Sequence, residues 1–297
     1  MKKPEVRSEE LLGAIATAFI GKTDNLFRFL EIHSGLPGPR MNDHLAVGFA
    51  LECARIGSQS DALLKQMASL PPNEARGAST KEFLSVCGVL GTAARAASIK
   101  DKAAREKAVL LLEEMAEDVR FRVRDSVPMG LAMLGAVMKD DLADRVEPWM
   151  DRYFQAAAVI RALAEPAWLE TFPLEDYYAP INLMHAAFML AHGAPRSAFR
   201  YPGHKALVEA LSSAPKALAR RFRLPMYDRY MIWASGVQIP ELREVILANV
   251  DDSQMKKAFG PDIKRIREAV EGSKKPPRDP TRLVKGMRGR GRKRDAL

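Results

Sequence analysis

The 297-residue sequence has only two cysteines, Cys53 and Cys87. They form no CxxC pair and no cluster with the spacing of metal ligands, so a zinc finger, an iron–sulfur site and a disulfide scaffold are not expected. A chain of this length buries well over half of its unfolded surface, so its stability requires neither a disulfide nor a metal. We therefore expect no metal site and no cofactor. The cysteine content is typical of a protein from the reducing cytoplasm.

Long hydrophobic runs are also absent. No window of the sequence approaches the roughly 18 uncharged apolar residues that a membrane-spanning helix needs. The first residues lack the apolar stretch of a signal peptide. We therefore expect a cytoplasmic protein that has no membrane segment.

Sequence motifs of common enzymes are missing. We find no Gly-rich phosphate loop, no nucleophile elbow and no HExxH pair. Among the five histidines, His185 and His192 share a helical face but lie about 10.5 Å apart along the axis, which is too far for one metal ion. We interpret the histidines as packing or surface residues. These absences favour a protein that is not an enzyme, although they leave an enzyme possible.

The alternating pattern of a β-strand is absent, whereas helical periodicity and strong helix formers run through the chain. The sequence thus predicts an all-α protein. The expected helices cover about 8–20, 24–34, 41–57, 61–70, 80–96, 102–117, 119–138, 141–150, 152–165, 176–192, 203–213, 216–235, 239–250 and 254–271.

The centre of the sequence contains a weak repeat. Asp118 and Asp151 lie 33 residues apart, and each precedes a stretch with helical periodicity. We expect both carboxylates to cap the helices that follow them. A period in this range is typical of helical solenoids.

Three segments resemble HEAT-repeat proteins: residues 34–42 (SGLPGPRMN), 120–134 and 156–166. The order of these segments is similar to that in a group of bacterial HEAT-repeat proteins of largely unassigned function, over about residues 20–250. The resemblance implies a right-handed superhelix, or α-solenoid, of antiparallel helical pairs with a concave inner surface. One departure is Ala156-Ala157, where the pattern carries Val-Arg, as Val123-Arg124 does.

The charge is unevenly distributed along the chain. Residues 271–297 contain ten Lys/Arg and three Asp/Glu, a net charge of +7, whereas the whole chain carries +9. This proline- and glycine-containing segment has too few apolar side chains to fold, so we expect a disordered tail after an α-solenoid domain at 1–270. Arginine pairs well with phosphate, so the tail is expected to bind DNA or RNA without sequence specificity. The residues expected to do so are Arg282, Lys285, Arg288, Arg290, Arg292, Lys293 and Arg294.

A second group of cations lies in the centre of the chain: Arg120, Arg122, Arg124 and Arg152, with Arg145 and Arg161 nearby. On a concave face these arginines would form a basic stripe that matches a phosphate backbone. The alternative, which we favour, is that they form salt bridges between repeats with aspartates such as Asp118 and Asp125.

A third candidate is the set Trp149, Asp151 and Trp168. Alkylpurine DNA glycosylases of the AlkD type are HEAT-like and use aromatic side chains and one carboxylate in a concave groove. By that resemblance Asp151 would stabilise the developing oxocarbenium ion, and the tryptophans would contact the cationic alkylated base. The alternative is that Asp151 is a helix cap and the tryptophans belong to the core.

We interpret the protein as a non-catalytic HEAT-repeat scaffold that binds a macromolecular partner, with a cationic tail that attaches to nucleic acid. Two alternatives remain open. One is a glycosylase that repairs alkylated DNA, and the other is a scaffold that binds only proteins.

Overall fold

The computed structural model describes residues 8–20 and 22–274, and every regular element in these ranges is a helix. The α-helices of the N-terminal half are α1 (Ser8–Phe19), α2 (Thr23–His33), α3 (Asp43–Ile56), α4 (Asp61–Ala68), α5 (Glu82–Ala97), α6 (Lys102–Met115), α7 (Phe121–Met138) and α8 (Asp140–Val146). Those that follow are α9 (Tyr153–Leu163), α10 (Pro166–Leu169), α11 (Tyr178–His192), α12 (Pro202–Leu211), α13 (Ala214–Phe222), α14 (Leu224–Gly236), α15 (Pro240–Val250) and α16 (Ser253–Gly272). Short 3-10 helices are η1 (Gly57–Ser60), η2 (Glu147–Asp151) and η3 (Arg196–Arg200). The prediction of an all-α protein is confirmed.

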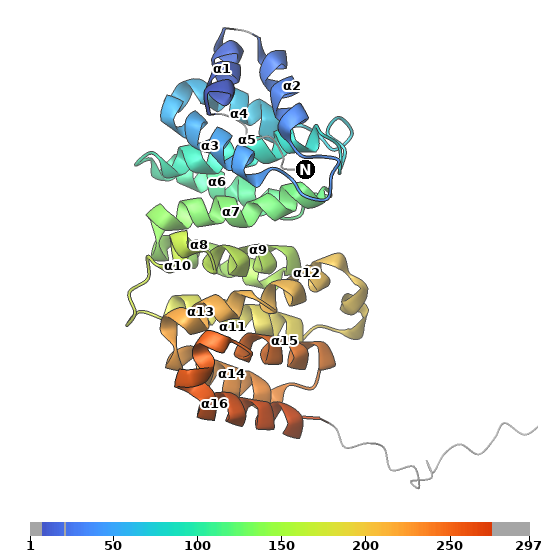
Figure 1. Ribbon diagram of the computed structural model, residues 1–297, viewed down its shortest axis with the longest axis vertical. Coiled ribbons are helices and arrows are strands. Elements are labelled where there is room, and N and C mark those ends of the chain that lie inside the picture. The colour runs from blue at the N-terminus through green and yellow to red at the C-terminus, as the bar shows by residue number, and fades with distance from the viewer. Residues whose placement is uncertain (1–7, 21, 275–297) are drawn as a thin grey trace, which may run out of the picture.

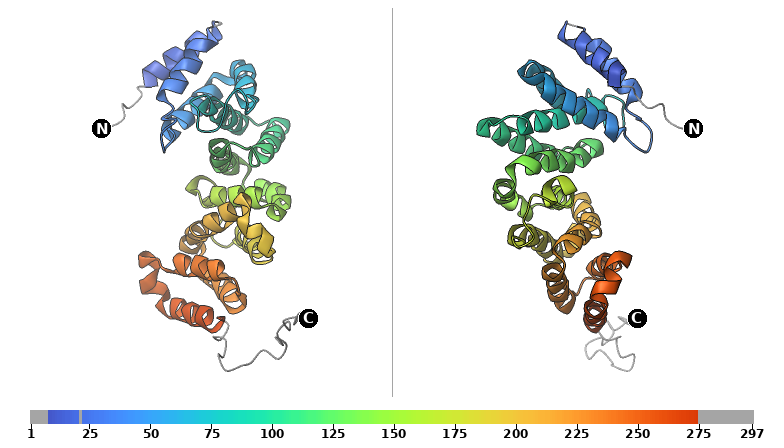
Figure 2. Two further views of the ribbon diagram at one scale, coloured as in Figure 1. Left: turned by 90° about the vertical axis from the view of Figure 1, so that its right-hand side faces the viewer. Right: turned by 60° about the vertical axis from the view of Figure 1, so that its left-hand side comes forward.

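The helices are stacked along the longest axis of the molecule, with α1 and α16 at opposite ends (Figures 1 and 2). One row consists of α3, α5, α7, α9, α12 and α15, and each of these helices packs on the next. The remaining helices from α4 onward lie beside this row and pack against it. One surface of the stack is therefore formed by the helices of the row, and another by the helices that lie beside the row.

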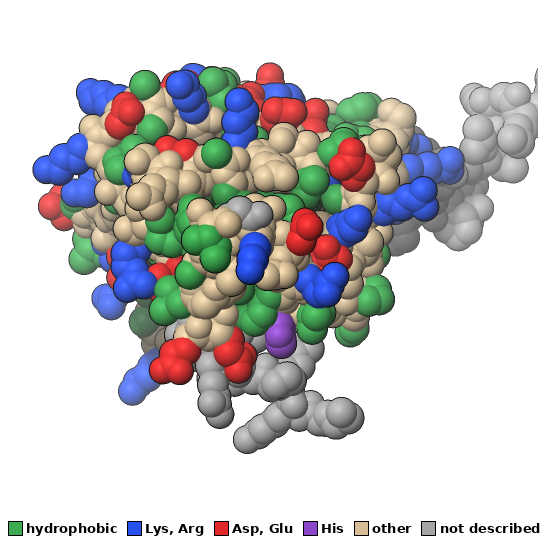
Figure 3. All heavy atoms as spheres, turned by 90° about the horizontal axis from the view of Figure 1, so that it is seen from above, with side chains coloured by type: hydrophobic (Ala, Val, Ile, Leu, Met, Phe, Trp, Pro, Cys, Tyr) green, Lys and Arg blue, Asp and Glu red, His purple; other side chains and the backbone are tan. Residues whose placement is uncertain are grey.

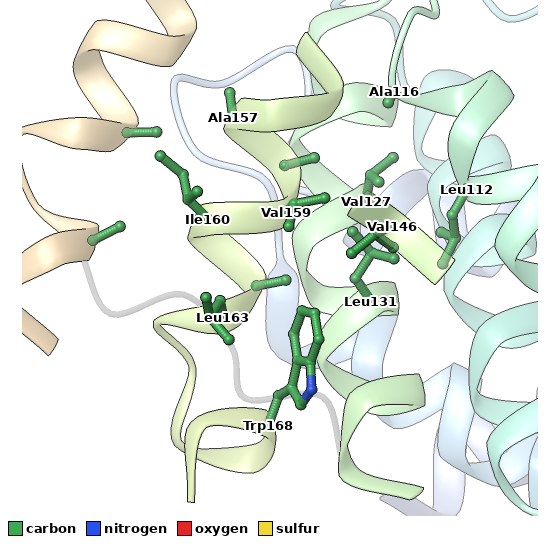
Figure 4. Packing of buried hydrophobic residues seen from close by; sticks show 14 of the residues in the cluster. Leu112, Ala116, Val127, Leu131, Val146, Ala157, Val159, Ile160, Leu163 and Trp168 are labelled. Atoms are coloured by element: carbon green, nitrogen blue, oxygen red, sulfur yellow. The ribbon is translucent and has the colours of Figure 1, made fainter. Parts of the chain in front are cut away.

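Buried aliphatic side chains form a core that continues from helix to helix. In Figure 4, Val127 and Leu131 of α7 and Val159 of α9 point toward one another. Trp168 of α10 closes the same region from the side and is fully buried. Stacking buries the apolar face that one helical pair would leave exposed, so neighbouring pairs stabilise one another.

Four helices of the row begin side by side. The buried carboxylate of Glu82, the first residue of α5, accepts a hydrogen bond from the backbone N–H of Arg122 in the first turn of α7 (2.8 Å). Further along, the ring of Phe154 in α9 contacts the ring of Tyr201, which precedes α12, with 5.6 Å between centroids. Arg124 of α7 also lies over the Phe154 ring. The helices α5, α7, α9 and α12 thus run in the same direction and share an N-terminal edge.

The single helix predicted at 216–235 is wrong, because the structure has α13 and α14 there. The chain breaks at Arg223, whose φ is +52°. Pro225 explains the break: it has no N–H to donate and its ring would clash with a preceding helical turn, whereas the first turn of a new helix tolerates proline.

The predicted helix caps are also wrong. Arg120 and Arg152, rather than Asp118 and Asp151, occupy the N-cap positions of α7 and α9. The helices begin later than the sequence pattern indicated. The carboxylate of Asp118 therefore accepts the backbone N–H of Arg120, the residue before α7 (2.7 Å), and also pairs with the Arg120 guanidinium. The side chain of Asp151 is 80 % exposed.

Residues 275–297, and with them nearly all of the predicted tail, lie outside the described residues. Within the described part, no helix is long and apolar enough to cross a membrane. The same residues hold no cluster of three or more His, Cys, Asp or Glu side chains that could bind a metal ion.

Candidate functional site

A hollow of about 310 Å³ lies across three successive helices of the row, and we call it the α7–α9–α12 groove. Its lining on α9 recurs at helical spacing, as does its lining on α12, so each helix turns one face toward the hollow. The side chains that carry its chemistry are Phe121 and Arg124 of α7, Phe154 and Arg161 of α9, and Lys205 and Glu209 of α12.

Arginines and phenylalanines are interleaved at one end of this groove. The guanidinium carbon of Arg124 lies 4.7 Å from the ring centroid of Phe154 and 6.0 Å from that of Phe121. The guanidinium carbon of Arg122 lies 5.2 Å from the Phe121 centroid. These are cation–π distances, which hold the arginines at the aromatic faces. Phe121 remains 56 % exposed, so part of its ring is free to receive another planar group.

The other end of the groove is closed by an ion-pair network. Arg161 contacts Asp125 of α7 (3.1 Å) and Glu209 of α12 (3.5 Å). The exposed ammonium group of Lys205 forms no ion pair within the described part of the chain. The groove therefore retains a cation that has no internal counter-charge.

The backbone adds to the positive potential of this region. Phe121, Phe154 and Lys205 all lie in the first turn of their helices. The unpaired N–H groups of a helix N-terminus carry a partial positive charge, and the N-termini of α9 and α12 meet at the groove. At the N-terminus of α7 the carboxylate of Glu82 already accepts the Arg122 N–H, so only α9 and α12 add a field that favours an anion.

An aromatic cage adjoins the groove around His204 in the first turn of α12. The His204 ring lies 5.0 Å from Phe199 and 5.5 Å from Tyr153, and its side chain is 5 % exposed. Its Nε2 atom finds no hydrogen-bond partner among the described residues. Burial lowers the pKa of His204, so the ring is neutral near pH 7.

The structure corrects the prediction that Arg120 contacts phosphate. Arg120 is 3 % exposed and pairs with Asp118 (2.6 Å). Its Nη1 donates to the carbonyl oxygen of Leu70 (2.9 Å) and to Ser85 Oγ (2.8 Å). A guanidinium held in this way is a structural link. Its ion pair is with a residue two positions away, so the contacts that reach other helices are its hydrogen bonds to Leu70 and Ser85.

The other predicted arginines lie closer to solvent. Arg122 donates to the carbonyl oxygen of Pro39 (2.6 Å), and both Arg122 and Arg124 are half-buried. Arg152, whose side chain is 40 % exposed, pairs with Glu113. Salt bridging thus occupies Arg152. Arg124 donates to the carbonyl oxygen of Asp118 and lines the groove, whereas Arg122 lies beside the Phe121 ring and is not among the lining residues.

The structure does not assemble the predicted glycosylase residues into a groove. Trp149 and Trp168 are 2 % and 0 % exposed, and Trp168 Nε1 donates to the carbonyl oxygen of Lys139 (3.2 Å). Their interpretation as aromatics that contact a base is wrong, because both fill the core. Asp151 is exposed, with Arg152 as its ion-pair partner at 3.6 Å.

The predicted nucleic-acid-binding residues of the tail lie outside the described residues, so their role stays a prediction. They are Arg282, Lys285, Arg288, Arg290, Arg292, Lys293 and Arg294.

Sequence reasoning missed Phe121, Phe154 and Lys205. One signal was present: Phe121 and Arg124 are three residues apart and Phe154 and Arg161 seven apart, so each pair lies on one helical face. The sequence does not show that these faces of α7 and α9 lie next to each other and next to Lys205.

Comparison with protein-family models gave no match, and no curated protein and no solved structure matched the chain either. The resemblance to HEAT-repeat proteins therefore stays a prediction.

Proposed function

We propose that this protein is a non-catalytic interaction module that binds single-stranded nucleic acid in the α7–α9–α12 groove. In this proposal the helical pairs form a right-handed, HEAT-like α-solenoid over residues 1–270. The tail at 271–297 adds non-specific attraction to DNA or RNA.

The observation that carries the proposal is the interleaving of arginine and phenylalanine at the groove. Proteins that bind single strands combine aromatic platforms for bases with cations that follow the phosphates. Phe121 offers an exposed ring, and Arg122 and Arg124 lie against it. Lys205 supplies a further cation across the groove. The tail has cations but no aromatic side chain, so the groove supplies the stacking that the tail lacks.

A single strand fits this arrangement better than a duplex does. Bases in a duplex are stacked on one another, and an exposed phenyl ring in a hollow reaches only a base that has left such a stack. Neither Phe121 nor Phe154 brings the donor and acceptor groups that read base edges. The expected binding is therefore tolerant of sequence.

The alternative of a glycosylase has weaker support. Its two aromatic residues, Trp149 and Trp168, are in the core, and its carboxylate, Asp151, lies on the surface. The alternative of a protein scaffold would use a different surface, the hollow between α4 and α6.

Binding of the full-length chain to a labelled homopolymeric oligonucleotide, measured by fluorescence anisotropy across a salt series, tests the proposal. Phe121→Ala should weaken binding by about 1–3 kcal/mol at every salt concentration, because a stacking platform is lost. Lys205→Gln should reduce the slope of log K against log salt by about one, because one phosphate contact is lost.

Two variants serve as matched controls. Phe19→Ala removes a partly exposed phenyl ring from α1, and Lys107→Gln removes an exposed lysine from α6. Both should bind like the unmodified chain. A chain in which the seven tail residues predicted to bind nucleic acid, of the ten tail cations, are replaced by glutamine separates tail from groove: it should bind with a shallower salt slope and keep its sensitivity to Phe121→Ala. Equal binding by Phe121→Ala, Lys205→Gln and the unmodified chain would overturn the proposal.

A further inference from the structure

A second hollow, of about 440 Å³, lies between α4 and α6, with α5 as its floor. We call it the α4–α6 groove. Buried or partly buried apolar side chains line it from all three helices: Leu64 and Ala68 of α4, Ala96 of α5, and Leu111 and Met115 of α6. Leu110 of α6, one turn from lining residues on either side, is 49 % exposed and extends the apolar surface beyond the rim.

The two walls of the groove run parallel. Asp61, the first residue of α4, pairs with Arg95 near the end of α5, so α4 runs antiparallel to α5. The next helix, α6, returns along α5 from the same end, where Ile99 and Ala104 both line the groove. Both walls pack on α5 far more than on each other, which leaves a channel between two parallel helices.

Charges at the rims distinguish the α4–α6 groove from the gap between α6 and α8. On the side of α6 that faces α8, Glu106 pairs with Arg145 (2.9 Å) and Glu113 pairs with Arg152. The molecule thus closes the gap beyond α6 with ion pairs of its own. No such pair joins α4 to α6 in the part of the chain that is described.

Lysines without an ion-pair partner among the described residues stand on both rims of the α4–α6 groove. Lys65 lies four residues into α4 and Lys107 five residues into α6, so each lies about 6–8 Å along its helix. Both side chains are exposed. Glu114 of α6 also lines the groove, seven residues beyond Lys107, and is exposed. An occupant would therefore meet an apolar floor flanked at mid-length by a cation on either side, with one carboxylate near the C-terminal end of α6.

We infer that the α4–α6 groove binds an acidic amphipathic helix of a partner protein. Such a helix lays apolar residues at i, i+3, i+4 and i+7 into a hydrophobic groove. Acidic residues on its two flanks would meet Lys65 and Lys107. The α4 wall is about 12 Å long, so two to three turns of the partner would fit. This inference does not depend on nucleic-acid binding, since the two grooves share no residue.

The test uses a displayed library of helical peptides selected on the full-length chain. Selected sequences should combine the apolar spacing above with Asp or Glu on both flanks. The soluble peptide should bind the Lys65→Glu/Lys107→Glu double variant more than about tenfold more weakly, because like charges then face each other. A peptide with lysine in place of its acidic residues should show the reverse preference.

Lys205→Gln is the matched control, because it removes an exposed lysine on the other groove and should leave peptide affinity unchanged. The labelled oligonucleotide should not displace the peptide. A selection that returns no acidic helical consensus, or a peptide that binds the double variant equally well, would overturn the inference. So would a concentration-dependent dimer of the unmodified chain that the double variant abolishes, because the groove would then hold a second copy. None of these outcomes bears on whether the α7–α9–α12 groove binds the oligonucleotide.

Discussion

His204 is buried in its aromatic cage in the neutral form, and this gives the protein a specific dependence on pH. Burial lowers the pKa of His204, although a backbone hydrogen bond with Ala191 and the charge of Glu241 oppose the shift. At pH values above the unfolded pKa of about 6.5, both states are neutral and the full stability is present. As the pH falls from there toward the folded pKa, the unfolded chain binds the proton more readily, so stability is lost.

We therefore expect the free energy of unfolding to fall as the pH drops below about 6.5 and the fall to be smaller in His204→Phe. Chemical denaturation at a series of pH values measures this. The exposed His44→Gln variant is the control and should follow the unmodified chain. Because burial also lowers the pKa of His185, part of the dependence should persist in His204→Phe. Identical pH profiles of His204→Phe and the unmodified chain would contradict the assignment to His204.

The helices α4 and α5 approach each other so closely that one position tolerates only glycine. A Cβ atom added at Gly88 of α5 would overlap the backbone of Ala68 in α4, and a backbone has no side-chain rotation with which to yield. Gly88→Ala should destabilise the protein by about 1–3 kcal/mol or more. Gly13→Ala in α1 is the control, because no described atom outside its own helical turn lies within 4 Å of the added Cβ. It should be neutral or stabilising by up to about 1 kcal/mol. Equal melting temperatures for the two variants would contradict this account.

The helices themselves were largely predictable from the sequence, because each buries an apolar stripe whose period is visible locally. The break at Arg223 was missed, since the apolar spacing of 216–235 continues across it and only Pro225 indicated it. The consequences of contacts between helices were not predictable. Gly88 is one of several helical glycines, and only the position of α4 shows why it matters.

The candidate site was predicted only in part for the same reason. Arg120, Arg122 and Arg124 alternate in the sequence, and nothing local distinguishes them. The start of α7 at Phe121 decides their roles: it places Arg120 in a buried pocket and leaves Arg124 at the groove. Lys205 lies more than 80 residues further along, and only the stacking of α7, α9 and α12 brings it to the same hollow.

At the scale of the whole molecule, Arg120 links successive layers of the stack through hydrogen bonds. It joins the segment before α7 to α5 through Ser85 and to the end of the α4 region through Leu70. Removing it would leave the carboxylate of Asp118, only 6 % exposed, without its partner. Loss of one member of a buried ion pair costs about 3–5 kcal/mol.

Arg120→Met should therefore lower the free energy of unfolding by about that amount, as measured by denaturant titration. Arg145→Gln is the comparison, because its pair with Glu106 is solvent-screened at about half exposure and should contribute much less to stability. An Arg120→Met variant as stable as Arg145→Gln would show that the buried Arg120–Asp118 pair does not stabilise the stack in this way.

The stacking of the row also has a mechanical meaning. Each helix of the row packs on the next, so a force applied to the two ends of the molecule passes through the inter-helix contacts one after another. We expect small rotations at these contacts to add up along the axis, so that the molecule lengthens under tension while every helix stays intact. A partner that spans several helices would resist this lengthening over the distance it covers.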